Sequence, residues 1–184
     1  MTEQEAQQQI SEWLQADHFR MQVLRTVQTL GLPECYVAAG FLRNLVWDQL
    51  HQKASSELND IDILYFNTVH SEDEKYAEHI LLQQFPTVSW DVKNQARMHL
   101  KHQHTPYASC AEAMSCWPEK ETAVGVRLGS DQRCEFIAPW GLSFLFDCCI
   151  TWNTKRPLSL FQQRVESKQW LARWPRLTLR MNND

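Results

Sequence analysis

The feature that most constrains the fold is a pair of aspartates: Asp60 directly precedes the apolar stretch 61–66, and Asp62 lies near its start. Such a stretch favours a buried strand. Side chains alternate across a strand, so the two carboxylates point to the same face. Neighbouring carboxylates need a cation between them, or one of them must bind a proton. The spacing suits a divalent hard cation such as Mg²⁺, although paired acids at a strand end can also be merely solvated.

A second motif lies upstream, where the short apolar stretch 35–37 is followed by Gly40 and by a segment with helical spacing. This order predicts a strand, a tight turn and a helix. The exposed N–H groups and the positive dipole end of such a helix attract anions, and the small residues at 38–40 let a phosphate approach the backbone. A plain turn explains a single glycine equally well. Combined with Asp60 and Asp62 one helix later, however, the turn predicts a phosphate site that faces a metal site.

The string Ala39-Gly40-Phe41-Leu42-Arg43-Asn44, followed by Asp60-Ile61-Asp62, resembles the signature of the polymerase-β-like nucleotidyltransferase superfamily. It is most similar to the G-G-x-V-R-D…D-x-D form found in tRNA nucleotidyltransferase and poly(A) polymerase head domains. Segments 92–99 and 117–128 are similar to a bacterial family of small nucleotidyltransferase-like proteins. The resemblance covers roughly residues 20–175. It implies an α/β (α+β) fold, in which a mixed twisted sheet has helices packed around it.

Two positions depart from that signature. Ala39 stands where the superfamily has its first glycine, and alanine is small enough to keep the turn. Asn44 stands where the head domains have aspartate, so the role of that carboxylate is left open in this chain.

Catalytic members of the superfamily carry a third carboxylate on a neighbouring strand, and Asp91 in the stretch 88–92 is the candidate. Alternation puts Asp91 on the face opposite Trp90. The resemblance implies that Asp60, Asp62 and Asp91 bind Mg²⁺ or Mn²⁺, hold the triphosphate of an NTP and align an acceptor oxygen for in-line attack on the α-phosphorus. Asp91 would hold the metal at the attacking oxygen or act as its base. An ordinary solvated strand face is the alternative.

Besides Ala39 and Gly40 in the turn, four cations are candidates for binding the nucleotide: Arg43, Lys93, Arg97 and Arg127. Arg43 lies one helical turn beyond Gly40, close enough to contact the same anion. Lys93 shares the strand face of Asp91, with which it could instead form an ion pair. Arg97 and Arg127 are candidates mainly because they lie in the family-like segments.

The length and hydrophobic content of the chain indicate a globular protein with a single core. A chain of 184 residues, 43% of them hydrophobic, can bury one sizeable core. We therefore expect one domain over 1–184, with N-terminal helices in 1–30 and a basic helix and tail in 151–184.

No apolar stretch approaches the roughly 18 residues of a membrane span, and the acidic N-terminus is unlike a signal peptide. Six cysteines without a C-x-x-C pair indicate free thiols in a reducing compartment, so we expect a cytoplasmic protein.

Hydrophobic periodicity and turn residues predict the remaining elements. Helices are predicted at 3–16 and 18–30, near 72–84, and at 140–150 and 157–171. Two strands near 122–128 and 133–138 form a predicted hairpin. Residues 101–118 are predicted to be mostly loop with a short helix.

The C-terminal segment is basic although the whole chain has a net charge of −4. Residues 153–184 carry seven Lys and Arg against two acids, interleaved with Phe161, Trp170 and Trp174. Nucleic acid-binding surfaces use this mixture. A final amphipathic helix with its aromatic side chains on the core and its cations in water explains it as well. We favour that explanation, because an acidic chain lacks a broad positive field.

Two functional hypotheses of different classes remain. In the first, the chain is a metal-dependent nucleotidyltransferase that moves a nucleoside monophosphate from an NTP, such as ATP, to an unknown small-molecule, RNA or protein acceptor. In the second, it is a non-catalytic nucleotide-binding or interaction module that retains the fold, with a role in a toxin–antitoxin pair as one form. The three aspartates favour the first hypothesis, whereas Ala39 and the short chain favour the second.

Overall fold

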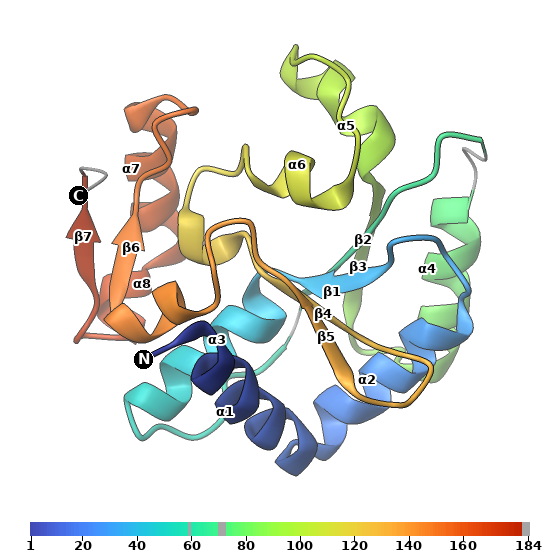
Figure 1. The fold of residues 1–184 in the computed structure, drawn as a ribbon, viewed down its shortest axis with the longest axis horizontal. Helices are drawn as coiled ribbons and strands as arrows, with labels where there is room; N and C mark the ends of the chain where they lie inside the picture. Colours follow the sequence, from blue (N-terminus) through green and yellow to red (C-terminus); the bar gives the residue numbers. More distant parts are fainter. Residues whose placement is uncertain (59, 70–72, 182–184) are drawn as a thin grey trace.

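A five-stranded mixed sheet with the strand order β3-β2-β1-β4-β5 lies at the centre of the molecule (Figure 1). The structure is a computed structural model that describes residues 1–58, 60–69 and 73–181. Strands β2 and β3 are parallel, and the other neighbouring pairs are antiparallel. The predicted mixed sheet is therefore confirmed. Its strands are β1 (Tyr36–Ala38), β2 (Asp60–Tyr65), β3 (Ser89–Asn94), β4 (Gly125–Leu128) and β5 (Cys134–Ile137).

Two amphipathic N-terminal helices pack beside the sheet, as their spacing predicts. Helix α1 (Glu3–Ala16) begins with a capping box, in which Thr2 and Glu5 each accept the other's backbone N–H. Asp17 ends α1 and caps α2 (His18–Thr29) by accepting from the Arg20 N–H at 2.9 Å. The other helices that accompany the sheet are α3 (Gly40–Leu50), α4 (Asp73–Gln84), α5 (Gln95–His102), α6 (Cys110–Met114) and the 3₁₀ turn Lys120–Thr122.

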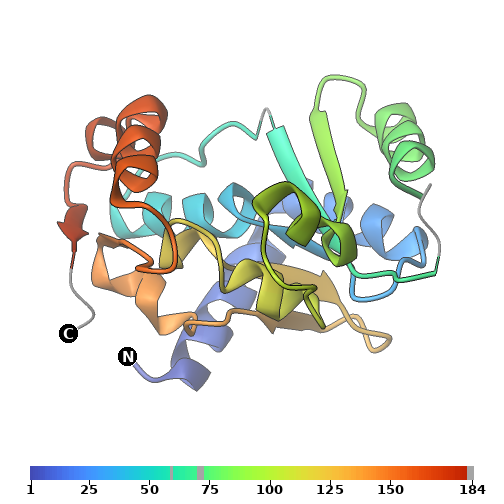
Figure 2. The same cartoon turned by 90° about the horizontal axis from the view of Figure 1, so that it is seen from above.

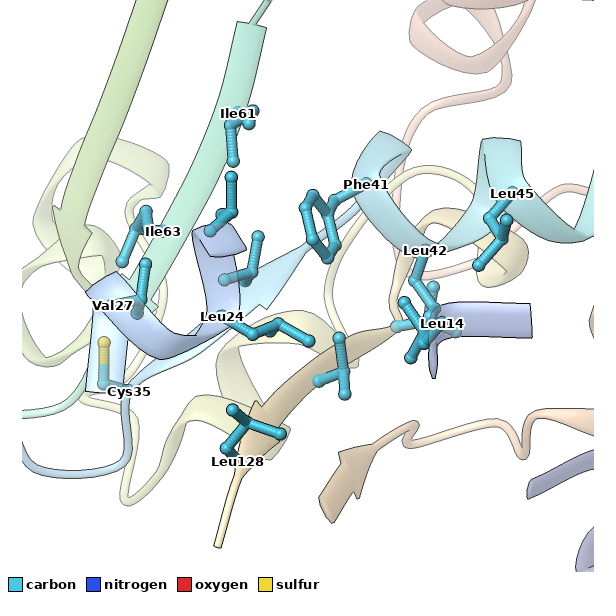
Figure 3. Close-up of a cluster of buried hydrophobic side chains, with 14 of the residues drawn as sticks. Leu14, Leu24, Val27, Cys35, Phe41, Leu42, Leu45, Ile61, Ile63 and Leu128 are labelled. Carbon is cyan, nitrogen blue, oxygen red and sulfur yellow. The ribbon is translucent and has the colours of Figure 1, made fainter. Parts of the chain in front are cut away.

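The main apolar core lies between one face of the sheet and helices α1 to α4. Alternation along β2 buries Ile61, Ile63 and Tyr65 on this face and leaves Asp60 and Asp62 on the other. Figure 3 shows how side chains of β2, α2 and α3 meet in this core. The burial that makes β2 a strand therefore also directs both aspartates away from the core.

The C-terminal segment forms a small unit against α3 (Figure 1, left). Strands β6 (Cys149–Thr151) and β7 (Thr178–Arg180) form a parallel pair, with α7 (Leu158–Lys168) and α8 (Trp170–Arg173) between them in the chain. The ring of Trp47 on α3 lies 5.1 Å from that of Trp174 and 6.2 Å from that of Trp170. Phe161, Trp170 and Trp174 are buried, so the predicted packing of the C-terminal aromatic residues on the core is confirmed.

The predicted helix at 140–150 is wrong. Gly141 (φ 87°) and Cys148 (φ 51°) both occupy the left-handed region, which an α-helix cannot continue through. Between them the chain forms a 3₁₀ segment, Ser143–Asp147, and Cys149 already belongs to β6. A short apolar run does not distinguish a helix from a strand. Strand β6 pairs with β7, about 30 residues later in the chain. Hydrophobic periodicity does not reveal such a long-range pairing. The predicted helix at 157–171 is also interrupted, at Gln169 (φ 50°).

Helix α5 was not predicted, because 101–118 reads as mostly loop and no helical signal stands out before it. Asn94, the last residue of β3, starts this helix by accepting from the Ala96 N–H at 3.1 Å. All six cysteines are free, as expected. In the part of the chain that the structure describes, no helix is both long and apolar enough to span a bilayer.

Candidate active site

The three predicted carboxylates lie on one face of the sheet, in the first halves of β2 and β3. Because these strands are parallel, Asp62 lies directly opposite Asp91, and Asp60 lies opposite Ser89. Asp60 and Asp91 are exposed, whereas Asp62 is half-buried. The structure therefore confirms that Asp60 and Asp62 share a face and that the strand of Asp91 adjoins theirs.

Negative charge is concentrated at this point. Burial, followed by the neighbouring Asp91 and Asp60 charges, raises the pKa of Asp62 to about 6. The positive charges of Arg43 and Lys168 act in the opposite direction on the pKa of Asp62. The Asp91 carboxylate itself forms an ion pair with Lys93. Among residues 1–58, 60–69 and 73–181, no three His, Cys, Asp or Glu side chains are placed to hold one metal ion.

The turn before α3 has a backbone suited to anions. Ala39 has φ 54° and ψ −121°, a conformation that strains any residue with a Cβ. Its N–H donates to the Val124 carbonyl at 2.8 Å, and its carbonyl accepts from the Arg43 N–H at 3.0 Å. A Cβ on Gly40 would lie 3.3 Å from Asn44 Nδ2. The first N–H groups of α3 lack an intrahelical acceptor and can therefore bind an anion.

Arg43 reaches this site, but its guanidinium is held within the protein. The residue is only 6% exposed. Its Nε and Nη2 donate to Asn44 Oδ1 at 3.2 and 2.9 Å, and its Nη1 donates to Thr122 Oγ1 at 2.7 Å. The guanidinium also lies 4.9 Å from the Trp47 ring centre and 4.7 Å from that of Trp170. Asn44, which replaces the aspartate of the signature, thus anchors Arg43.

A cavity of about 830 Å³ joins these elements. Ala39, Gly40, Lys93 and the three aspartates line it, together with residues of the loop that follows α3. In that loop, Ser56 is fixed by the buried Asp48 carboxylate, which accepts from its N–H at 2.7 Å and from its hydroxyl at 2.9 Å. Figure 2 shows β2 and β3 right of centre and α7 at the left. The C-terminal segment adds four further cations to the cavity lining: Arg156, Arg164, Lys168 and Arg173.

These four cations were expected in solvent, because no local pattern places them near Asp62, about 100 residues earlier. Conversely, two predicted cations do not line the cavity. Arg97 is exposed and pairs with Glu74 at 3.5 Å. Arg127 pairs with Glu135 at 2.7 Å and lies 4.9 Å from the ring centre of Tyr36. Other residues of the family-like segments, such as Lys93, Met98 and Thr122, do line the cavity.

Comparison with known proteins settles the family. A model of a family described as nucleotidyltransferase matches residues 25–179. The chain belongs to this nucleotidyltransferase family. A search of curated proteins gives no significant match.

Solved structures agree with this assignment. This nucleotidyltransferase is 32% identical to a protein whose NMR structure is reported to reveal a CCA-adding enzyme head domain, with a TM-score of 0.83 over 95% of this chain and 96% of that one. CCA-adding enzymes in complex with CTP and with ATP share its fold, with TM-scores of 0.62 and 0.60 at 14% and 15% identity. They cover 94% and 90% of this chain, which spans only 43% and 42% of theirs. Family and fold together support an NTP-using transferase.

Replacing Ala39 by glycine should stabilise this nucleotidyltransferase by about 1 kcal/mol. Glycine removes a backbone strain of about 1–3 kcal/mol, of which its greater freedom in the unfolded chain offsets about 0.5–1 kcal/mol. Urea unfolding measures the difference. The matched control is Ala38→Gly, in the buried strand β1, which should be destabilising. Equal destabilisation by both changes would mean that Ala39 is unstrained.

The carboxylate cluster should also make stability depend on pH. The folded pKa of Asp62 is raised from 3.8 to about 6, so the protonated form favours folding at low pH and this contribution is lost as pH rises through 6. Asp62→Asn cannot ionise. In EDTA, its stability relative to wild type should therefore increase by about 2 kcal/mol between pH 4.5 and 7.5. Asp131→Asn, on the exposed hairpin turn, is the control, and parallel pH profiles for wild type and Asp62→Asn would contradict the prediction.

Proposed function

We propose that this chain is a metal-dependent nucleotidyltransferase that transfers a nucleoside monophosphate from an NTP to an acceptor and releases pyrophosphate. One observation carries the proposal: Asp60, Asp62, Asp91 and the Gly40 turn line a single cavity. Anion-binding N–H groups thus lie beside carboxylates that suit a cation, which is what an NTP with its divalent ion requires.

The chemistry of the three aspartates fits Mg²⁺ or Mn²⁺. Hard divalent cations prefer carboxylate oxygens, and the raised pKa of Asp62 reflects burial together with the unbalanced charges of Asp91 and Asp60. These three residues would hold the cation, which would neutralise negative charge on the phosphates when bound. The Asp91–Lys93 ion pair must then open or rotate.

The residues of the chain have separate tasks in the reaction. The N–H groups at the start of α3 bind phosphate oxygens and fix the triphosphate. The acceptor hydroxyl oxygen forms a bond to the α-phosphorus while the bond from that phosphorus to the bridging β-phosphate oxygen breaks. The hydroxyl proton passes to the Asp91 carboxylate, and pyrophosphate leaves.

A second candidate function is nucleotide binding without turnover. It is favoured by the Asp91–Lys93 pair. It is also favoured because, within the described ranges, no three His, Cys, Asp or Glu side chains are arranged to hold one ion. In that case NTP would bind and dissociate unchanged.

Paired isotope labels separate the two functions. The protein is incubated with each NTP labelled at the α- or the γ-phosphate, with Mg²⁺ or Mn²⁺ and with RNA, protein or small-molecule fractions of a cell extract. Transferase activity moves the α-label to an acceptor and releases the γ-label as pyrophosphate. Binding of NTP without any transfer of the α-label in all fractions would support the second function. Movement of the γ-label would instead indicate a kinase and contradict both.

A further inference from the structure

The side of the cavity formed by the C-terminal unit is basic, although the protein carries a net charge of −4. Arg156 precedes α7, Arg164 and Lys168 belong to α7, and Arg173 ends α8. All four line the same cavity as Asp60, Asp62 and Asp91. This arrangement places cations and carboxylates around one volume rather than in separate surface patches.

The four cations differ in how much of their charge is already balanced. Arg164 donates from Nε and Nη2 to the fully buried Glu119 carboxylate, at 2.6 and 3.2 Å. Arg156 donates to the Cys116 carbonyl at 3.4 Å. In the part of the chain that the structure describes, Lys168 and Arg173 have no carboxylate within ion-pair distance. Both are exposed, so their charges are available to a ligand.

The unit that carries these cations has a fixed position relative to the phosphate turn. Trp170 and Trp174 pack on Trp47, which lies on the same helix as Gly40. The guanidinium of Arg173 lies 4.5 Å from the ring centre of Trp174, which restricts its direction. The cations therefore do not depend on a mobile tail to reach the site.

The cations of the C-terminal unit share the cavity lining with Arg43. Arg164 and Arg173 both lower the pKa of Arg43, in addition to the larger effect of its burial. Like charges that repel one another at a cavity wall bind most favourably to a ligand with several negative charges.

We propose that Lys168 and Arg173 form a polyphosphate subsite that binds the β- and γ-phosphates of the NTP. This inference rests on the proposed function, and it gives the leaving pyrophosphate a defined location between the start of α3 and the C-terminal unit. Attacking and leaving oxygens are roughly in line at the phosphorus. The acceptor must consequently enter from a part of the cavity that the polyphosphate does not occupy, and the lining also includes Met98, His102 and Ala113 of α5 and α6.

Inorganic tripolyphosphate tests the subsite, because it contains neither base nor ribose. Its affinity for the full chain is measured by calorimetry in millimolar Mg²⁺. Lys168→Ala and Arg173→Ala should each weaken binding about tenfold, the effect of losing roughly 1.4 kcal/mol, and the double variant should weaken it more than either. Lys168→Arg keeps the charge and should stay close to wild type. Arg133→Ala, on the hairpin turn and 86% exposed, removes one charge elsewhere and should have little effect.

The outcomes distinguish the subsite from the proposed function. Wild-type affinity for tripolyphosphate in the double variant would overturn the subsite even if the α-label is transferred, and so would the absence of tripolyphosphate binding by the wild type. Loss of affinity in the double variant without any transfer of the α-label by the wild type would support the subsite and contradict the transferase. Thermal melts check that the variants remain folded, which their exposed side chains favour.

Discussion

Replacing Asp60 and Asp62 together by alanine should abolish nucleotidyl transfer, with a loss of at least about a thousandfold, and should remove the effect of metal on NTP binding. Unit charges about 4 Å apart repel by roughly 4 kcal/mol at an effective dielectric of 20. The wild type should therefore bind NTP weakly in EDTA and at least about tenfold more tightly, by roughly 1.4 kcal/mol, in Mg²⁺ or Mn²⁺. Without the two carboxylates, binding in EDTA should remain or even strengthen. Calorimetry with and without metal measures both effects.

Two further variants make this experiment specific. Asp91→Asn should lose transfer but keep metal-dependent binding, because Asp60 and Asp62 remain. Glu57→Ala removes a carboxylate that also lines the cavity but does not belong to the β2–β3 cluster, and it should retain transfer. Equal wild-type affinity for NTP in EDTA and in Mg²⁺ would show that the aspartates hold no catalytic metal. The binding module would then be the better description.

Trp47→Ala should destabilise the protein by about 3–5 kcal/mol, the usual range for removing a buried tryptophan. Trp47 is completely buried between α3 and the C-terminal unit. Its loss should also separate Trp170 and Trp174 from α3 and weaken tripolyphosphate binding, because Arg173 would no longer be held in place. Urea unfolding and calorimetry measure the two effects. Leu171→Ala, at an exposed position of α8, is the control, and a cost near that of the control would refute the role of Trp47.

Sequence reasoning recovered those parts of the fold and site that depend on local pattern. Alternation in the stretches around Asp62 and Asp91 placed both carboxylates on the face opposite the core, because the period of a strand is fixed. The tight turn at Gly40 was also foreseen, since a strand, a glycine and a helical pattern followed in order. Ala39 was expected to keep the turn, but the pattern did not show that it would do so with a positive φ of 54°.

The remaining parts of the site depend on contacts between distant residues. Arg43 was expected to bind phosphate, but the pattern did not show that Asn44 and Thr122 would hold its guanidinium. The basic C-terminal segment could be read as an amphipathic helix, yet only its packing on Trp47 brings Lys168 and Arg173 into the lining of the cavity that holds the carboxylates. Long-range packing of this kind has no periodic signal in a single sequence.

Helix α3 connects the two ends of the proposed triphosphate site. Its first residue, Gly40, forms the phosphate turn, and Trp47, seven positions later, supports the unit that carries Lys168 and Arg173. At 1.5 Å per residue the two points are about 10 Å apart along the helix axis. The length of α3 thus sets the distance between the phosphate turn and the cations proposed to bind the leaving pyrophosphate. Inserting one residue between Gly40 and Trp47 would rotate the indole by about 100° around the axis and move the cations away from the site, whereas Asp60, Asp62 and Asp91 lie on strands outside this helix.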